Sequence, residues 1–274
     1  PPFRRSVVSG WLSTHAPQSF SDLAMPETVR DPLSSASQSA DPPHFLITGP
    51  SGVGKTAAWR LVARQLLGLG WNSTTHVLQA RDLVRQRGAM NTFEEFLRPG
   101  GSGSADTLAG RLSLDAFDRG ISSSGPGGAA PAGEENAIVE GKLPISRLIV
   151  IEDADHLGSI RQAYLRRMME TVGEASRFIL VARAPSRIID ALRSRTQMFR
   201  IPSTSRETIL SCLAELTHIE GVDTAEGVLE DIAYISEGNL RKAIFTLEML
   251  HLRGLANDRS AVHTLVQSTT MQSG

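Results

Sequence analysis

The sequence predicts an α/β fold with a doubly wound parallel sheet, followed by a small domain made only of helices. Expected strands and helices alternate up to about residue 202, whereas every periodic segment beyond that point has helical spacing. The unbroken apolar runs Arg147–Ile151 and Phe178–Ala182 are typical of central parallel strands buried on both faces. The third observation is a glycine-rich segment, 49–56, which joins the first apolar run directly to a helix-like segment.

The first 97 residues predict an arm and then the beginning of the sheet. Residues 1–43 form the expected N-terminal arm with one or two short helices, because Trp11–Pro43 is polar and interrupted by prolines. Phe45–Thr48 is short and apolar, which predicts the first strand, and Thr56–Leu67 has the spacing of a helix. Two further elements complete this part, a strand at Thr75–Gln79 and a helix at Asp82–Leu97.

Residues 99–141 differ in composition from the segments on either side. Gly, Ser, Ala and Pro dominate there, as in the run Ser122–Pro131. Such a segment buries too little apolar surface to offset its ordering entropy, so we expect a disordered insertion. Leu108–Phe117 keeps an amphipathic spacing and predicts one short helix within it.

The elements after the insertion complete both predicted domains. In the α/β domain, residues 44–202, we expect strands at Arg147–Ile151, Phe178–Ala182 and Met198–Ile201, and helices at Ser159–Val172 and Ile188–Arg193. The helical domain, residues 203–254, is expected to contain helices at Arg206–Glu220, Thr224–Ser236 and Leu240–Leu252.

The composition excludes several classes of protein. A formal net charge of −1 argues against a globally basic nucleic-acid binder, so any DNA contact has to come from clustered arginines. The single cysteine, Cys212, excludes an internal disulfide framework and a cysteine-based zinc site, and it fits a reducing intracellular compartment. No apolar run approaches the length of a membrane span, and no signal-peptide core is present, so we expect no membrane partner.

The glycine-rich segment matches the phosphate-binding pattern G-x-x-x-x-G-K-[ST]. Its residues are Gly49, Pro50, Ser51, Gly52, Val53, Gly54, Lys55 and Thr56. In such a loop backbone N–H groups converge on the phosphates, the helix N-terminus adds its positive dipole end, and the lysine reaches the β- and γ-phosphates. Thr56 is then placed to hold Mg²⁺ through its hydroxyl. The alternative is a glycine-rich turn with a chance lysine, although the chain has only three lysines.

Carboxylates follow the central apolar run that ends at Ile151. A nucleotide hydrolase needs one acidic group to hold the metal and one to orient the attacking water. Glu152 and Asp153 stand where these groups are needed, so we expect Glu152 as a metal ligand and Asp153 as the group that orients water. The alternative is a strand that simply ends in solvated acids.

Short segments spread from Trp11 to about Gly254 form one collinear pattern. They are Trp11–Pro17 with Phe20–Leu23, Asp41–His44, Glu152–Asp155, Leu165–Glu170, Arg177–Ile189 with Ser194–Thr196, and Gly238–Ala243. Together they resemble the clamp-loader branch of the AAA+ ATPases, most closely the small subunits of replication factor C. The resemblance implies an AAA+ P-loop fold with a helical lid, and ATP and Mg²⁺ as cofactors.

Two arginines take roles from this resemblance. It implies that Arg195, just before the last strand, is an arginine finger inserted into the ATP site of a neighbouring subunit. It also implies that Arg241, at the start of a lid helix, reaches the γ-phosphate bound by its own subunit. The plainer alternatives are a surface arginine and a cation on a helix surface.

The resemblance also implies partners, namely other clamp-loader subunits, the sliding clamp, and primer–template DNA held through its backbone. Arg161, Arg166 and Arg167 are the candidate phosphate-tracking stripe, with a solvated helix face as the alternative. We expect residues 255–274 to be the start of a truncated collar or a tail. The implied location is the nucleus of a eukaryote, or the cytoplasm or nucleoid of an archaeon.

Departures from the family pattern affect hydrolysis more than binding. The family's metal-binding Asp and catalytic Glu appear in reverse order as Glu152 and Asp153, and Arg183 stands where a polar asparagine is usual. His15 and Ala16 also replace a Tyr-Arg pair. A displacement of about 1 Å at such a site costs on the order of a hundredfold in rate, so slow or absent hydrolysis is expected.

Three functional hypotheses follow. The first is a clamp-loader subunit, an ATPase that uses ATP binding and hydrolysis to load the clamp in DNA replication. The second is a subunit that binds ATP but hydrolyses it poorly, while it donates Arg195 to its neighbour. The third is a replication-initiator AAA+ ATPase, against which the lack of a winged-helix segment after the lid argues.

Overall fold

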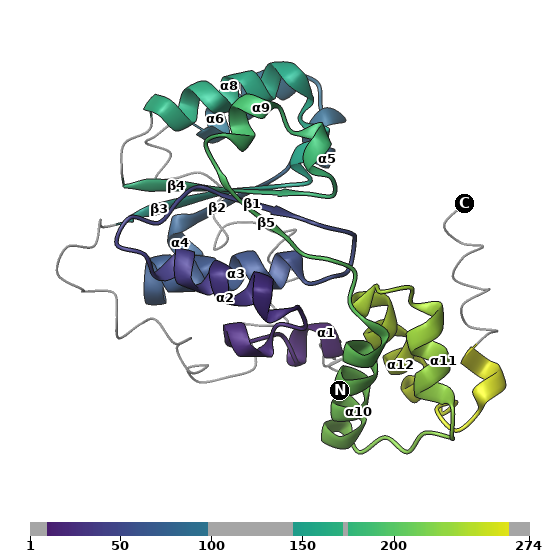
Figure 1. The fold of residues 1–274 in the computed structure, drawn as a ribbon. Helices are drawn as coiled ribbons and strands as arrows, with labels where there is room; N and C mark the ends of the chain where they lie inside the picture. The colour runs from purple at the N-terminus through teal and green to yellow at the C-terminus, as the bar shows by residue number, and fades with distance from the viewer. Residues whose placement is uncertain (1–9, 98–144, 172–174, 263–274) are drawn as a thin grey trace, which may run out of the picture. The chain divides into compact units, whose positions relative to one another are not determined.

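A parallel sheet of five strands forms the centre of the larger of two compact units (Figure 1). The computed structural model describes residues 10–97, 145–171 and 175–262. Among these residues, 17–49 and 55–201 belong to the larger unit, which we call the sheet unit. The helical unit takes the others, including the short segment Pro50–Gly54.

The strands of the sheet run parallel in the order β2-β3-β4-β1-β5. Their bounds are Phe45–Thr48 (β1), Thr75–Gln79 (β2), Arg147–Glu152 (β3), Ser176–Ala182 (β4) and Gln197–Arg200 (β5). β1 lies between β4 and β5, so that Phe45 pairs with Ile179 on one side and with Gln197 on the other. The side chains of β3 and β4 are almost all buried, as uninterrupted apolar runs predict. The predicted doubly wound parallel sheet is confirmed.

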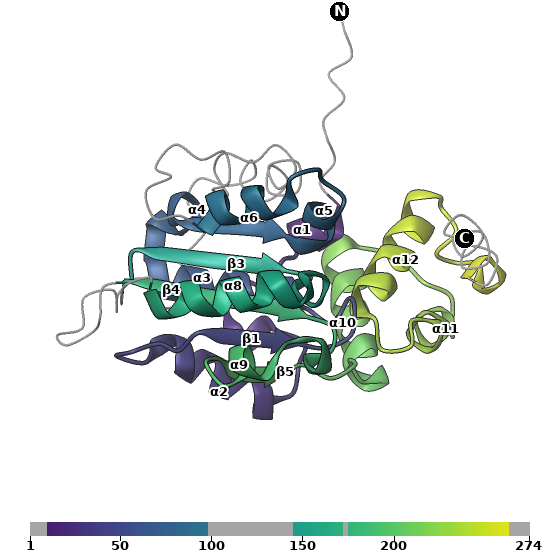
Figure 2. The same cartoon turned by 90° about the horizontal axis from the view of Figure 1, so that it is seen from above.

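Helices cover both faces of this sheet. On one face lie α5 (Ala80–Val84), α6 (Ala89–Leu97), α8 (Gly158–Thr171) and α9 (Asp190–Arg193), and on the other lie α2 (Glu27–Gln38), α3 (Lys55–Leu67) and α4 (Trp71–Thr74). Figure 2 shows α6, α8 and α9 next to one another across the first face. Short 3₁₀ turns connect several elements, at Phe20–Asp22 (η1), Gly68–Gly70 (η2), Ala154–His156 (η4) and Pro185–Arg187 (η5).

One predicted helix is wrong as a single element. The chain forms α5 and α6 in place of one helix at Asp82–Leu97, because Gly88 adopts a φ of 75° and redirects the backbone. The break lets α6 turn its own apolar face inward, where Phe93 and Phe96 join the core beneath α8. Helical spacing alone did not reveal that this face belongs to a separate element.

The N-terminal arm contains more helix than its composition predicts. α2 is 12 residues long and includes Pro32, and it buries Leu33 and Ser37 completely. It packs against α3, so a segment of low intrinsic helix propensity gains its stability from tertiary contact. The predicted arm is also divided between the two units after Ala16.

The helical unit contains α1 (Trp11–Thr14), α10 (Arg206–Glu220), α11 (Val228–Ile235) and α12 (Leu240–Leu252). Trp11 packs with Leu213, Ile232 and Leu247 in its core. The side chains of Ser205 and Asn239 cap the first turns of α10 and α12. α11 begins after Gly227, which has a φ of 83°, and therefore starts four residues later than the expected Thr224.

The disordered insertion expected at 99–141, with its short helix at Leu108–Phe117, lies outside the described residues, as do the last 12 residues of the expected collar or tail. Within the described ranges, no helix has the length and apolar character that crossing a membrane requires.

Candidate nucleotide-binding site

The phosphate-binding motif follows β1 directly, and its first glycine is required by close packing. A Cβ atom on Gly49 would lie 2.2 Å from the backbone oxygen of Ile201, closer than any side chain permits. Gly54 has a φ of 93° and no atom within 4 Å of the position where its Cβ would stand. The loop is therefore tight at its start and open where a phosphate group has to approach the backbone.

Lys55 is the first residue of α3. Its Nζ donates to the backbone oxygen of Gly49 at 2.8 Å, so the ammonium group is held against the beginning of its own loop. The first backbone N–H groups of a helix have no partner within the helix, and its dipole places positive charge at the same end. The beginning of α3 therefore combines a cation with the features of an anion site.

Glu152, the last residue of β3, accepts hydrogen bonds from three side chains. Thr56 Oγ1 and Trp59 Nε1 donate to its Oε1 at 3.1 and 2.7 Å, and Gln79 Nε2 donates to its Oε2 at 2.5 Å. Thr56 and Trp59 come from α3, whereas Gln79 ends the neighbouring strand β2. The structure thus brings the two predicted metal ligands, Thr56 and Glu152, together.

Asp153 follows in an unusual backbone conformation. Its φ of 51° lies in the left-handed region, which few residues other than glycine adopt. Its Oδ2 lies 3.5 Å from Nε of Arg81, and its side chain is 31% exposed. The two adjacent carboxylates therefore have separate partners: Arg81 lies beside Asp153, whereas Glu152 is bound by side chains of α3 and β2.

The oxygen atoms of this site suit Mg²⁺. Hydroxyl and carboxylate oxygens are hard ligands, and Mg²⁺ in proteins is usually bound by one or two carboxylates together with substrate phosphates and water. The described residues contain no group of three or more His, Cys, Asp or Glu side chains arranged as metal ligands. A pair such as Thr56 and Glu152 therefore fits a metal that is shared with a phosphate, and it does not fit an all-protein metal cage.

Arg183 and Arg195 are exposed in the sheet unit. Arg183 follows β4 directly. Arg195 follows α9, where its guanidinium donates to the backbone oxygen of Ala191 at 2.8 Å and forms an ion pair with Glu170 of α8. Arg166 shares the same Glu170 oxygen at 3.5 Å. These contacts place Arg195 on the surface beside α8.

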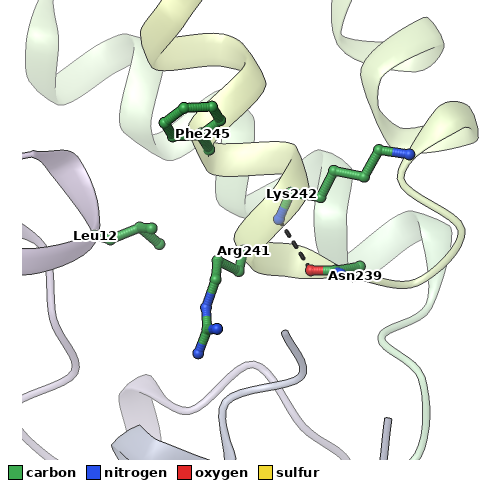
Figure 3. A pocket seen from close by; sticks show the side chains of 5 residues that line it. All are labelled: Leu12, Asn239, Arg241, Lys242 and Phe245. Atoms are coloured by element: carbon green, nitrogen blue, oxygen red, sulfur yellow. Dashed lines mark hydrogen bonds between the residues drawn. The ribbon is translucent and has the colours of Figure 1, made fainter. Parts of the chain in front are cut away.

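Arg241 lies in the helical unit, at the start of α12. Its backbone N–H donates to the oxygen of Gly52 at 3.1 Å. Its side chain lines a pocket of about 230 Å³ together with Leu12, Asn239, Lys242 and Phe245. Figure 3 shows the Arg241 guanidinium pointing away from Lys242, whose amino group donates to the oxygen of Ile235 at 2.7 Å.

Pro50, Ser51, Gly52 and Val53, the predicted binding residues at the tip of the loop, belong by their contacts to the helical unit. A Cβ atom on Gly52 would stand 1.8 Å from Oδ1 of Asn239, the residue that caps α12. A glycine is thus needed where the loop tip meets this cap.

Sequence reasoning missed four residues that contact the predicted site. They are Trp59, Gln79, Arg81 and Asn239. Gln79 could have been predicted from its position at the end of an expected strand, because the carboxyl ends of neighbouring parallel strands meet at one edge of a sheet. Trp59 could also have been predicted, since it stands three residues after Thr56 and therefore on the same face of α3.

Two family models match the chain. The model for the ATPase family associated with various cellular activities (AAA) covers residues 45–203, and the RCF1/5-like, AAA+ ATPase lid domain covers residues 211–252. The AAA match includes the loop at 49–56 together with Glu152, Asp153 and Arg195. Proteins of this family bind nucleotide.

Three relatives are replication factor C small subunits. Replication factor C small subunit 1 of Pyrobaculum islandicum is 31% identical to this chain over 92% of its residues. The protein of the same name in Pyrobaculum arsenaticum is 30% identical over 95%. The replication factor C small subunit of Aeropyrum pernix is 30% identical over 87% of it. The chain spans 65%, 67% and 61% of the length of these three relatives.

Solved structures support the fold. The RuvB Holliday junction branch migration motor of Thermotoga maritima matches with a TM-score of 0.59 and 17% identity over 92% of this chain and 72% of that one. A RuvB variant from the same organism matches with a TM-score of 0.61 and 16% identity over the same shares. At such low identity the likeness shows the AAA+ fold alone. With the family models and the relatives, however, it leads to one conclusion: the chain belongs to the AAA ATPase family and, within it, to the replication factor C small subunits.

Proposed function

We propose that this chain is an ATP-binding subunit of a sliding-clamp loader, which uses ATP to load the clamp onto primer–template DNA. The observation that carries the proposal is the 3.1 Å hydrogen bond between Thr56, inside the phosphate-binding motif, and Glu152 at the end of β3. Such a pair supplies the oxygen ligands that Mg²⁺·ATP needs. The relatives named replication factor C small subunit supply the biological role.

The binding residues act in different ways. The backbone N–H groups of the loop and of the first turn of α3 donate hydrogen bonds to the phosphate oxygens, and Lys55 exchanges its bond to Gly49 for a bond to the β- and γ-phosphates. Thr56 and Glu152 hold Mg²⁺, which neutralises the charge of the phosphates. Thr56 keeps its oxygen lone pairs available for the metal, because its hydroxyl proton is donated to the carboxylate of Glu152.

Hydrolysis needs further groups. Asp153 is the proposed residue that orients the attacking water, Arg241 the proposed contact to the γ-phosphate, and Arg195 the proposed arginine finger for the neighbouring subunit. In the isolated chain Arg195 is bound to Glu170, so docking onto a neighbour has to replace that ion pair. The pair is partly exposed, which keeps its replacement inexpensive.

Two observations favour the second candidate, a subunit that binds ATP but hydrolyses it poorly. Asp153 is turned by its left-handed backbone and lies beside Arg81, which competes for the carboxylate that should orient water. The second observation is Arg183, which stands where the family usually has an asparagine. An arginine carries a fixed positive charge and, unlike asparagine, cannot accept a hydrogen bond. In this second candidate function, Arg195 still acts as the arginine finger in the ATP site of the neighbouring subunit.

The proposed partners are other clamp-loader subunits, the clamp and the DNA backbone. The three arginines proposed for DNA already have contacts within α8 or with the residue just before it. Arg161 donates to the oxygen of Leu157 at 2.9 Å, Arg166 pairs with Glu170, and Arg167 stacks over Tyr164 at 5.0 Å from the ring centre. The side chains of Arg166 and Arg167 are at least partly exposed, so phosphate groups can replace or share their contacts.

The test is steady-state ATPase of the assembled complex with clamp and DNA, comparing the native chain with Asp153→Asn and Arg195→Ala. An active subunit predicts that both variants lower turnover, and loss of the finger is expected to cost about a thousandfold at the neighbour's site. The hydrolysis-poor subunit predicts that only Arg195→Ala has an effect. If neither variant changes turnover, the clamp-loader ATPase proposal is wrong.

A further inference from the structure

Trp59 makes a contact that the phosphate-binding pattern does not require. The residue lies in the second turn of α3, is completely buried, and carries a single polar atom, the indole Nε1. That atom donates to Oε1 of Glu152 at 2.7 Å. Hydrogen bonds to an ionised carboxylate are short and roughly twice as strong as neutral ones, so this contact is a strong restraint on the carboxylate.

The three donors leave the two oxygens of Glu152 in different states. A carboxylate oxygen accepts about two hydrogen bonds, and Oε1 already accepts from both Thr56 and Trp59. Oε2 accepts only from Gln79 among the hydrogen bonds of the described residues. The lone pair that is free to meet a cation, or a water bound to it, is therefore on Oε2, and the orientation of the whole group depends on the donors at Oε1.

The length of the side chain explains why an additional donor is needed. Glutamate carries one methylene and one rotatable bond more than the aspartate usual at this position, so its carboxylate has more orientations to lose. An indole is suited to restrict it, because it is rigid, donates only, and cannot itself take a metal ligand's place. Gln79 fixes the other oxygen from β2, which leaves the carboxylate held from two directions.

We infer that Trp59 is a positioning residue for the divalent cation, through its bond to Glu152. The inference rests on the proposed function, since it concerns the Mg²⁺ that accompanies ATP. Trp59 orients Oε2 toward the cation and compensates for the additional methylene of Glu152. It contacts neither metal nor nucleotide itself. Residues that orient metal ligands in this way typically change metal affinity by tenfold to a hundredfold when they are replaced.

The first experiment measures ATP binding by the full chain against Mg²⁺ concentration. Trp59→Phe keeps the ring but removes the N–H, and Trp71→Phe on α4 is the matched control. Trp59→Phe is expected to raise the Mg²⁺ concentration for half-maximal binding about tenfold and to leave ATP affinity in EDTA within about twofold of native. In the Glu152→Asp background the shorter carboxylate withdraws from the indole. There Trp59→Phe is expected to change the Mg²⁺ concentration for half-maximal binding by less than about twofold.

A second measurement does not depend on replacing Trp59. The chain contains three tryptophans, so the ¹H–¹⁵N spectrum of the labelled protein contains three indole N–H signals. Glu152→Asp is expected to move the Trp59 signal and to leave those of Trp11 and Trp71 in place. An unmoved Trp59 signal contradicts the bond itself.

The outcomes separate this inference from the proposed function. If native protein binds ATP and Trp59→Phe leaves the Mg²⁺ requirement unchanged, Trp59 is only a packing residue and the inference is overturned, whatever the spectrum shows. If native protein binds no ATP even with Mg²⁺, the proposed function fails and the inference fails with it. A tenfold higher Mg²⁺ requirement that disappears in the Glu152→Asp background supports both.

Discussion

Asp153 Oδ2 lies 3.5 Å from Arg81 Nε, and the backbone of Asp153 is held at a φ of 51°. Arg81 is in α5, which begins directly after β2, so the helix that follows one strand restrains the acid that follows the neighbouring strand β3. The carboxylate proposed to orient the attacking water therefore has a cation as its partner before any nucleotide binds. This pair is the structural basis for expecting slow hydrolysis.

Replacing Arg81 should release that carboxylate. We predict that Arg81→Gln raises the ATP turnover of this subunit in the assembled complex by roughly tenfold, because a small displacement at a catalytic group has an effect of that order or larger. Arg85→Gln, which changes an exposed arginine just after α5, is the control and should leave turnover unchanged. Lower turnover in Arg81→Gln would mean that Arg81 aligns Asp153 rather than restrains it.

The contact between Gly52 and Asn239 predicts a stability effect. Gly52→Ala places a methyl group 1.8 Å from Asn239 Oδ1 and adds strain at a φ of 76°, so we expect the free energy of unfolding to fall by roughly 2–3 kcal/mol. In the Asn239→Ala background the clash is removed, and the same substitution should cost only about 1 kcal/mol, which is the backbone strain alone. Denaturant melts of the four proteins measure both values. Equal costs in the two backgrounds would contradict the contact.

His44 predicts how stability depends on pH. Burial, followed by the positive charge of Arg177, lowers the pKa of His44 to about 4 against the opposing effect of Asp41. The neutral ring is required, since its Nδ1 accepts the backbone N–H of Phe178 at 3.2 Å. In the unfolded chain the pKa is about 6.5, so the unfolded state takes up the proton first as the pH falls.

The contribution of His44 is therefore complete above about pH 6.5 and is lost as the pH falls toward 4. His44→Asn places a non-titrating acceptor near the position of Nδ1. We predict that the native protein loses about 2 kcal/mol more than His44→Asn when urea unfolding at pH 7 is compared with unfolding at pH 4.5. Parallel losses in the two proteins would show that His44 does not titrate in this way.

The sheet was predictable because its sequence signals are local. Leu148–Ile151 and Phe178–Ala182 are apolar without interruption, and runs of that length are typical of strands buried on both faces. The break between α5 and α6 was not predictable, because Gly88 acts within a segment whose helical spacing continues on both sides. A short helix was expected in the N-terminal arm, but the 12-residue length of α2 was not, since contact with α3 and not its own propensity stabilises it.

The candidate site also has parts that the sequence predicted and parts that it did not. The loop at 49–56 and the two acids were visible as a motif, and the structure places Thr56 beside Glu152. The left-handed conformation of Asp153 and its pairing with Arg81 depend on how β2 and β3 end side by side, which no single segment of sequence records. The spacing of Trp59 from Thr56 places it on the right face of α3, but the direction of its one polar atom is set by the packing of that helix.

The central claim is that the loop at 49–56 binds ATP, and direct titration of the full chain with ATP and Mg²⁺ tests it. Lys55→Ala removes the cation at the start of α3 and is predicted to abolish measurable binding, a loss of about a hundredfold or more, because a charge-assisted contact to phosphate is lost. Lys142→Ala, which removes a lysine outside the loop, should bind like the native chain. Tight ATP binding by Lys55→Ala would contradict the account.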